Sequence, residues 1–389
     1  MYKIRFDKDE LNNLTSNYLG KYKDKLREEI KGFMSGKADF LFNHTVGSKK
    51  KKTFTLKVCD SPPSFTYKFL EECVDAKNTR LDNLLIGDIN AQIAIIKDVL
   101  NNDPSHFEQL SAQKATKMGY YDGDVVDDFN TIMHEIFVNR SFDGDKCKRK
   151  VHALTLDKDD FVKNLKIRIC PYCGRAYIYR VEKKGKNGDV FVKPQLDHFL
   201  PKSNYPFLGM NFFNLIPCCT QCNLVPCKGD NDPMESSKQK IAYLMHPYDF
   251  DEKGIRFIHQ LKGPDTYNPD SYDVIVGYKD KDLKKGYNNF LAIDKLYAEH
   301  NIEICNMYLK ARAFRVVDNG FYKSIGMNGI PIALLTHGIL GFNLNNVEER
   351  RQLMYKFQKD SVLQIVKPNN SAKTNYFVDW NGKEIIVIA

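Results

Sequence analysis

Two CxxC pairs constrain this chain more than any other feature of its sequence. There are ten cysteines, and six of them fall between Cys170 and Cys227. Four of the six form two pairs, Cys170 with Cys173 and Cys219 with Cys222. A single pair could be a redox couple, whereas two pairs supply the four sulfurs of a tetrahedral zinc site. Clustering of this kind is unlike the spread of cysteines in a secreted disulfide scaffold, so we expect a structural zinc ion.

The long interval between the two pairs exceeds the spacing of a compact zinc ribbon. A folded unit must therefore lie inside the zinc loop. Residues 190–196 predict a strand ending at Asp197, 201–203 predict a turn, and 214–217 predict a returning strand. A short helix is expected near the second pair. Two strands and a helix would bring four polar residues to one surface: Asp197, His198, Asn214 and Asn223.

These residue types suit phosphodiester hydrolysis, which needs an activated water and a cation to offset negative charge. His198 can take a proton from water near neutral pH. Asp197 and Asn223 offer the hard oxygen ligands that Mg²⁺ prefers. Asn214 can hold the loop that carries the histidine or orient the imidazole.

The order CxxC … DH … N … CxxCN resembles the HNH endonucleases, the zinc-containing ββα-metal type. The resemblance covers about residues 166–250. It implies that His198 is the general base and that Asn214 is the middle asparagine. It also implies that Asp197 and Asn223 bind Mg²⁺ or Mn²⁺. The zinc ligands would be Cys170, Cys173, Cys219 and Cys222.

The chain departs from the family pattern at two positions. Asn223 stands where the last metal ligand is often histidine, and Lys228 follows CN later than the usual lysine does. The role of Lys228 is therefore open. Cys218 and Cys227 are expected to be spare. For His246, packing against the zinc module is favoured over a contribution to the active site.

The expected fold class is α+β, with mainly helical flanking regions around a small zinc-stapled nuclease module. We expect a mainly helical region over 1–165, the HNH module over 166–250, and a mixed, mainly helical region over 251–389. This domain order resembles the Septu-type nuclease subunit of bacterial antiphage systems, which works beside a separate ATPase. No GxxxxGK[ST] phosphate loop occurs in the sequence, so an intrinsic ATPase is not expected.

Periodicity predicts several elements in the flanking regions. A short strand and a long helix are expected over 1–36, with a capping box from Asp7 to Glu10. Residues 66–100 and 125–140 are expected to be mostly helical, and helices are expected over 293–311 and 346–366. Strands are expected over 255–260, 272–278 and 385–388, and a hairpin is expected from 176–181 to 189–196.

The net charge of +9 is compatible with a polyanionic partner but does not establish one. Six basic residues are candidates for phosphate contact: Lys148, Arg149, Lys183, Lys184, Lys202 and Lys228. Lys183 and Lys184 are expected at the tip of the hairpin, where a solvated turn is the equal alternative. No run of 18 apolar residues occurs, so no membrane span is expected. The charged N-terminus is unlike a signal peptide, and a cytoplasmic location is expected.

The leading hypothesis is a metal-dependent DNA endonuclease in defence against foreign DNA. A non-catalytic zinc module that binds DNA or a partner protein is the first alternative. An RNase or nuclease toxin is the second, because both nucleic acids present phosphates. The flanking regions are expected to supply DNA grip, a dimer surface or docking for a partner.

Overall fold

The computed structural model describes eleven stretches of the chain. These are residues 3–36, 42–48, 50–102, 104–143, 154–185, 188–235, 240–324, 337–341, 353–366, 375–378 and 384–387. Lys148 and Arg149 lie outside them, as do the side chains of Lys183 and Lys184.

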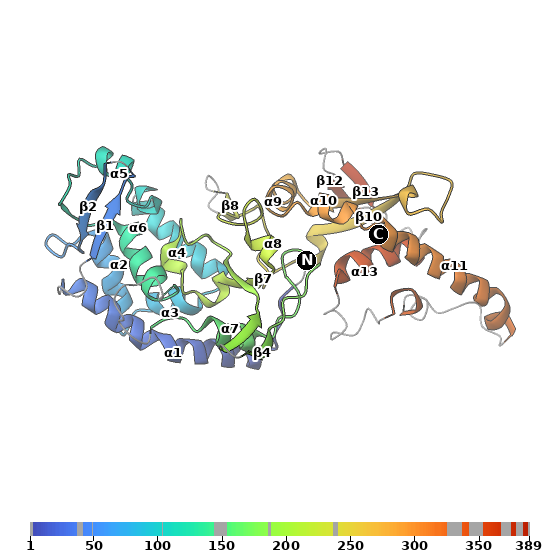
Figure 1. Cartoon of the computed structure of the whole chain (residues 1–389), viewed down its shortest axis with the longest axis horizontal. Helices are drawn as coiled ribbons and strands as arrows, with labels where there is room; N and C mark the ends of the chain where they lie inside the picture. The colour runs from blue at the N-terminus through green and yellow to red at the C-terminus, as the bar shows by residue number, and fades with distance from the viewer. Residues whose placement is uncertain are drawn as a thin grey trace.

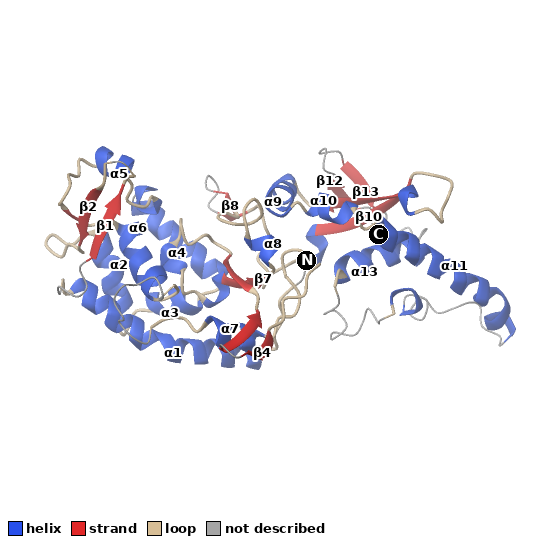
Figure 2. Cartoon of the chain, in the orientation of Figure 1, coloured by secondary structure: helices blue, strands red, loops and turns tan. Residues whose placement is uncertain are grey.

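The structure confirms an α+β fold in which helices predominate and the sheets are small (Figure 2). The helices are α1 (Lys8–Met34), α2 (Phe65–Val74), α3 (Arg80–Ile86), α4 (Ile89–Asn102), α5 (Ala112–Lys117), α6 (Phe129–Met133), α7 (Lys158–Leu165), α8 (Thr220–Asn223), α9 (Lys281–Leu291), α10 (Ile293–Ala298), α11 (Asn301–Ser324) and α13 (Tyr355–Val366). A π-helical segment, His134–Arg140, continues α6.

The strands form one three-stranded sheet, one four-stranded sheet and three two-stranded sheets among the described residues. They are β1 (Phe42–Val46), β2 (Lys52–Leu56), β3 (Val125–Val126), β4 (Val181–Gly185), β5 (Gly188–Val192), β6 (Gln195–His198), β7 (Leu215–Cys218), β8 (Met234–Glu235), β9 (Lys240–Ile241), β10 (Ile255–Leu261), β11 (Tyr272–Tyr278), β12 (Asn375–Val378) and β13 (Glu384–Val387). In Figure 1 the N-terminal helices lie at the left and the sheet of β10 to β13 at the right, with β7 and α8 between them.

Helix α1 begins where the sequence predicts. The Asp7 side chain accepts a hydrogen bond from the Glu10 backbone amide, which caps the helix. Its apolar stripe is buried from Tyr18 onwards. The short strand expected before it was wrong for residues 3–7, where the Ile4 amide bonds to the Pro247 carbonyl at 3.0 Å and no sheet ladder forms.

The hairpin between the two cysteine pairs has a different register from the one predicted. Residues 176–178 pair with 168–170 instead, through Cys170 N to Ala176 O and Ile178 N to Arg168 O. The hairpin is therefore formed by β4 and β5, so Lys183 and Lys184 lie within β4 rather than at the tip. Pro194 has no amide hydrogen, and it separates β5 from β6.

The C-terminal elements follow the predictions with two differences. The helix predicted over 346–366 begins at Tyr355, after a turn at 353–354, and residues 346–352 lie outside the described stretches. Strands β10 and β11 pair antiparallel where alternation predicts them. The helix predicted over 293–311 is two helices, α10 and α11, which meet at His300. The His300 ring bonds to Arg175 Nε at 2.9 Å and to the Glu303 carboxylate at 2.9 Å, so it lies at the rim of the core.

The main hydrophobic core is continuous across both expected domain boundaries. It runs from Ile4 in the N-terminal segment to Phe357 in α13. The buried Tyr18 hydroxyl in α1 donates to the Met210 carbonyl at 2.7 Å. Both flanking regions therefore pack directly on the segment that contains the paired cysteines. Among the described helices, none combines the length and the apolar character that crossing a membrane requires.

We expect the buried His259 to make the folded chain less stable in mild acid. Burial lowers the pKa of His259 to about 4 from its ordinary value of 6.5. Between these values the unfolded chain binds a proton that the folded chain does not, so the free energy of unfolding falls as the pH is lowered from 6.5 towards 4. At pH 5 the loss from this ring is about 2 kcal/mol.

Urea unfolding at pH 7 and pH 5 measures this loss. His259→Gln should reduce it, because glutamine does not titrate and can still bond to the Tyr308 hydroxyl that His259 contacts at 2.9 Å. His337→Gln is the matched control, since His337 is exposed. The prediction fails if the His259 and His337 variants show the same loss.

Candidate metal and catalytic site

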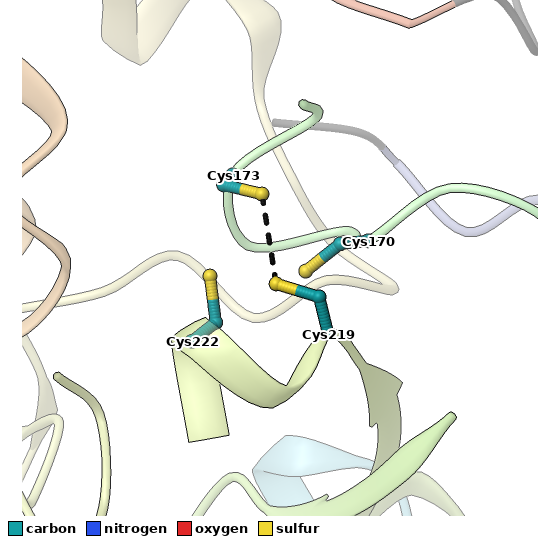
Figure 3. A group of neighbouring side chains, drawn as sticks. All are labelled: Cys170, Cys173, Cys219 and Cys222. Atoms are coloured by element: carbon teal, nitrogen blue, oxygen red, sulfur yellow. Dashed lines mark hydrogen bonds between the residues drawn. The ribbon is translucent and has the colours of Figure 1, made fainter. Parts of the chain in front are cut away.

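The four paired cysteines converge on one point, as Figure 3 shows. Their sulfurs lie within 4.8 Å of one another, and Cys173 Sγ is 4.0 Å from Cys219 Sγ. Sulfurs at the corners of a tetrahedron around zinc, each about 2.3 Å from the ion, are about 3.8 Å apart. Three of the thiols are buried and Cys219 is half-buried. This cluster can therefore hold a metal ion such as zinc.

Local structure explains the convergence. The first pair lies on a tight loop in which the Gly174 amide bonds to the Cys170 carbonyl at 2.8 Å. Gly174 has a φ of 69°, which glycine adopts without strain. The second pair lies at helix α8, where Cys219 is the N-cap and Cys222 is in the third position. We call these two segments, residues 170–174 and 219–222, the first and second knuckles.

The thiols perturb one another. Burial raises the pKa of Cys170 well above its usual value. Hydrogen bonds from neighbouring thiols, with Cys170 foremost, lower the pKa values of Cys173 and Cys219. Hydrogen bonds from the same neighbours, with Cys170 foremost, raise the pKa of Cys222. Because the thiolate is the form that binds metal, a bound cation would have to offset the resistance of Cys170 and Cys222 to ionisation.

Strands β6 and β7 and helix α8 follow in the expected order. The two strands pair antiparallel, with Asp197 opposite Ile216 and His198 opposite Leu215. Asn223 is the last residue of α8. The second knuckle therefore begins directly where the two-stranded sheet ends.

Asn214 closes the loop between these strands. Its side-chain oxygen accepts from the Leu200 amide at 2.7 Å, and its Nδ2 donates to the carbonyls of Leu200 at 3.1 Å and Leu208 at 3.2 Å. Asn214 is fully buried. These bonds hold the segment that follows His198 in one conformation, as one of the two sequence-based interpretations of this asparagine expects.

His198 is held in one tautomer. Its Nε2 lies 3.0 Å from the Gly209 carbonyl, which can only accept, so Nε2 carries the hydrogen and the neutral ring has its lone pair at Nδ1. The ring packs edge-on against Phe142, with centroids 4.4 Å apart. Burial lowers the pKa of His198 to about 3.

Asp197 is paired inside the protein. Its Oδ2 accepts a hydrogen bond of 2.5 Å from the Tyr172 hydroxyl and lies 3.7 Å from Lys228 Nζ. Burial raises the pKa of Asp197, and the charge of Lys228 opposes that rise. Lys228 is fully buried, and its Nζ also donates to the His198 carbonyl at 3.2 Å. Its ammonium therefore faces Asp197, which differs from the surface phosphate contact expected from the sequence.

A pocket of about 300 Å³ opens beside these residues. It is lined by Phe142, Leu196, Asp197, His198, Pro201, Lys202, Asn223, Leu224, Val225, Gly229 and Asp230. The pocket thus brings together the carboxylate, the imidazole and the amide that the sequence places on one surface. Asn214 does not line the pocket but closes the loop that follows His198.

One pocket residue, Phe142, and its neighbour Asp143 come from the N-terminal region and were missed by sequence reasoning. Phe142 lies in the pocket wall, and the neighbouring Asp143 pairs with Lys202 at 2.7 Å and with Lys158 at 2.9 Å. Burial opposes ionisation of Asp143, but these lysines hold its pKa well below the usual range. No local pattern around Phe142 marks it as a site residue, because only the tertiary fold brings it to His198.

The remaining candidates do not line the pocket. Cys218 and Cys227 are not part of the four-sulfur cluster. His246 is buried, its Nε2 bonds to the Phe213 carbonyl at 3.0 Å, and its ring packs edge-on against Phe199. Burial lowers the pKa of His246 to about 4. These contacts agree with the packing role favoured for His246.

Comparison with known proteins gives one partial similarity. No protein-family model matches the sequence, and no solved structure matches the chain. Over 107 residues the chain is 32% identical to a protein of Bacillus thuringiensis described as Septu protein PtuB. The matched stretch makes up 27% of this chain and 35% of that protein, so the chain spans about a third of the length of the curated relative it matches. The similarity is thus to a Septu protein, over part of each chain.

Proposed function

We propose that this chain is a metal-dependent HNH endonuclease that hydrolyses DNA phosphodiester bonds in bacterial defence against foreign DNA. The observation that carries this proposal is the pocket lined by Asp197, His198 and Asn223 beside the four-thiol cluster. A base and two oxygen ligands for a hard cation at one place are what hydrolysis of a phosphodiester needs.

In the proposed reaction His198 is the general base. The Gly209 carbonyl holds Nε2–H, so Nδ1 accepts a proton from the water that attacks phosphorus. A bond from the water oxygen to phosphorus forms as the bond to the leaving ester oxygen breaks, and that oxygen takes a proton from solvent. The contact with Phe142 keeps the imidazole from turning away from the pocket.

Asp197 and Asn223 would hold the divalent cation, Mg²⁺ or Mn²⁺. Carboxylate and amide oxygens are suitable ligands for such ions, and both residues line the pocket that contains His198. When bound, the cation supplies positive charge that offsets the negative charge on the phosphate. The four cysteines would hold a structural zinc ion, as the spacing of their sulfurs allows.

Lys202 is the basic residue that we place nearest to the substrate phosphate. Its side chain lines the pocket, is 31% exposed and reaches Asp143 at 2.7 Å. An entering phosphate would compete with Asp143 for the ammonium group. Contacts from Lys148, Arg149, Lys183 and Lys184 stay predictions from the sequence.

A zinc module that binds DNA or a partner without cleaving is the alternative. Such a module has no use for an imidazole held in one tautomer beside a carboxylate and an amide, and this supports hydrolysis. RNA is the alternative substrate. Plasmid DNA, linear DNA and RNA, each incubated with and without Mg²⁺, distinguish these possibilities: the proposal expects Mg²⁺-dependent cleavage of DNA, and cleavage of RNA alone would reject it.

A defence role is supported by the similarity to Septu protein PtuB. By that resemblance we propose that a separate ATPase subunit acts with this chain, since its own sequence has no GxxxxGK[ST] loop. A homo-oligomer formed through the flanking regions is a further proposal. Measuring the mass of the purified chain in solution tests it.

The first expected result concerns zinc. Protein purified without added zinc should contain about one zinc ion per chain, because four thiolates complete one tetrahedral site. Cys173→Ser or Cys222→Ser should lose the ion and unfold the surrounding segment, since metal binding stabilises the fold here. Elemental analysis and circular dichroism measure both effects. Cys227→Ser is the matched control, because Cys227 lies outside the cluster. Absence of metal together with four freely reactive thiols would contradict the assignment.

The second expected result separates the catalytic ion from zinc. Asp197→Ala and Asn223→Ala should keep the zinc and the fold but lose Mg²⁺-dependent cleavage. Asn231→Ala is the matched control: Asn231 is near Asn223 in the chain, but its side chain bonds to the Cys227 carbonyl at 2.7 Å. Cleavage by Asp197→Ala at the wild-type rate would show that the ligand set is wrong.

The third expected result ranks the histidine and the middle asparagine. His198→Ala should slow cleavage by about 10²- to 10⁴-fold, the usual contribution of a general base. Asn214→Ala should slow it less, because Asn214 holds the loop and transfers no proton. Single-turnover cleavage rates at saturating Mg²⁺ measure both variants. A larger loss for Asn214→Ala in folded, zinc-containing protein would reverse the two roles.

A further inference from the structure

A residue of the first knuckle and a residue bonded to the second knuckle contact the same oxygen atom of Asp197. The first is Tyr172, which lies between the two cysteines of its pair. The second is Lys228, which follows the second knuckle in the chain. Neither residue belongs to the zinc ligands or to the residues that line the pocket. Tyr172 and Lys228 therefore both contact Oδ2 of Asp197 from outside the pocket.

Tyr172 is directed inwards by its knuckle. Its side chain is 3% exposed, and its hydroxyl donates to Asp197 Oδ2 at 2.5 Å. The backbone on either side of Tyr172 is fixed by the turn in which the Gly174 amide bonds to the Cys170 carbonyl. The position of this hydroxyl therefore follows from the conformation of the first knuckle.

Lys228 is tied to the second knuckle through its backbone. Its amide donates to the Cys222 carbonyl at 3.0 Å. Its buried ammonium then contacts the His198 carbonyl at 3.2 Å and Asp197 Oδ2 at 3.7 Å. One side chain thus spans from the second knuckle to the two adjacent residues at the end of β6.

We propose that Tyr172 and Lys228 are positioning residues that fix the Asp197 carboxylate for the divalent cation. They hold Oδ2 on the inner side. Oδ1 has no hydrogen-bond partner within the described residues and is left for the ion. This inference rests on the proposed function, because it assigns residues that act on a ligand of the catalytic ion.

The physical reason is preorganisation. A free carboxylate rotates about its terminal torsion, and binding a cation must then stop that rotation. Outer-shell partners that prevent it usually contribute 10- to 100-fold in metal affinity. Here the partners extend from the two knuckles, so the conformation of the zinc cluster also sets the orientation of the catalytic ligand.

Mn²⁺ titration followed by electron paramagnetic resonance tests this with the zinc-containing full-length chain. The catalytic site is defined as the Mn²⁺ binding that the wild type shows and that Asp197→Ala lacks. Tyr172→Phe should weaken that binding by about tenfold or more, while zinc content and thermal unfolding stay as in the wild type. The matched control is Tyr205→Phe, which removes an equally buried hydroxyl that bonds to Asp232 at 2.7 Å.

Lys228→Met distinguishes a positioning role from a pure charge effect, because the two predict opposite changes in Mn²⁺ affinity. Loss of a nearby positive charge would strengthen Mn²⁺ binding if Lys228 acted only through its field. Loss of positioning weakens it, and we expect weakening by about tenfold or more in variants that retain zinc. Stronger binding would overturn the role of Lys228. If Lys228→Met lost its zinc, Tyr172→Phe would decide alone.

The outcomes separate this inference from the proposed function. If the wild type and Asp197→Ala bound Mn²⁺ equally, the ion site itself would be wrong and the inference would fail with it. If Asp197→Ala lost the site but Tyr172→Phe bound as tightly as Tyr205→Phe, the positioning role alone would be overturned.

Discussion

The structure around the pocket depends on four thiols held within one small space. Thiolates at such distances repel one another, and buried thiols resist ionisation, so a bound cation would stabilise the arrangement. The cluster joins a loop before the two-stranded sheet to a helix after it. Everything between, including Asp197 and His198, is anchored at both ends by that junction.

The central unit was largely predictable because its signals are local. Sequence spacing alone indicates the paired cysteines, the adjacent Asp197 and His198, and the returning strand before the second pair. Strands β6 and β7 and helix α8 follow in the order that this spacing predicts. The register of the hairpin of β4 and β5 could not be predicted in this way. Residues 176–178 pair with 168–170, and hydrophobic periodicity does not indicate which segment a strand pairs with.

The tertiary contributions to the pocket lie beyond any spacing argument. Phe142 reaches His198 from the N-terminal region, and Lys228 turns inwards although lysine usually faces solvent. Tyr172 was within reach of sequence reasoning, since the direction of a side chain between two clustered cysteines is restricted. The hydrogen-bond partner of the Tyr172 hydroxyl could not be predicted from the sequence. Only the fold shows that its hydroxyl meets Asp197 rather than water.

The contacts of the first knuckle have a consequence for biosynthesis. The Tyr297 hydroxyl donates to the Cys173 carbonyl at 2.7 Å, and the Met354 amide donates to the Gly174 carbonyl at 2.7 Å. Both donors are synthesised long after the knuckle has left the ribosome. A nascent chain can therefore gather its four thiols early, yet it completes the surroundings of the knuckle only after Met354 has been synthesised. A chain interrupted before Met354 would therefore lack this contact with the first knuckle, even with all four thiols in place.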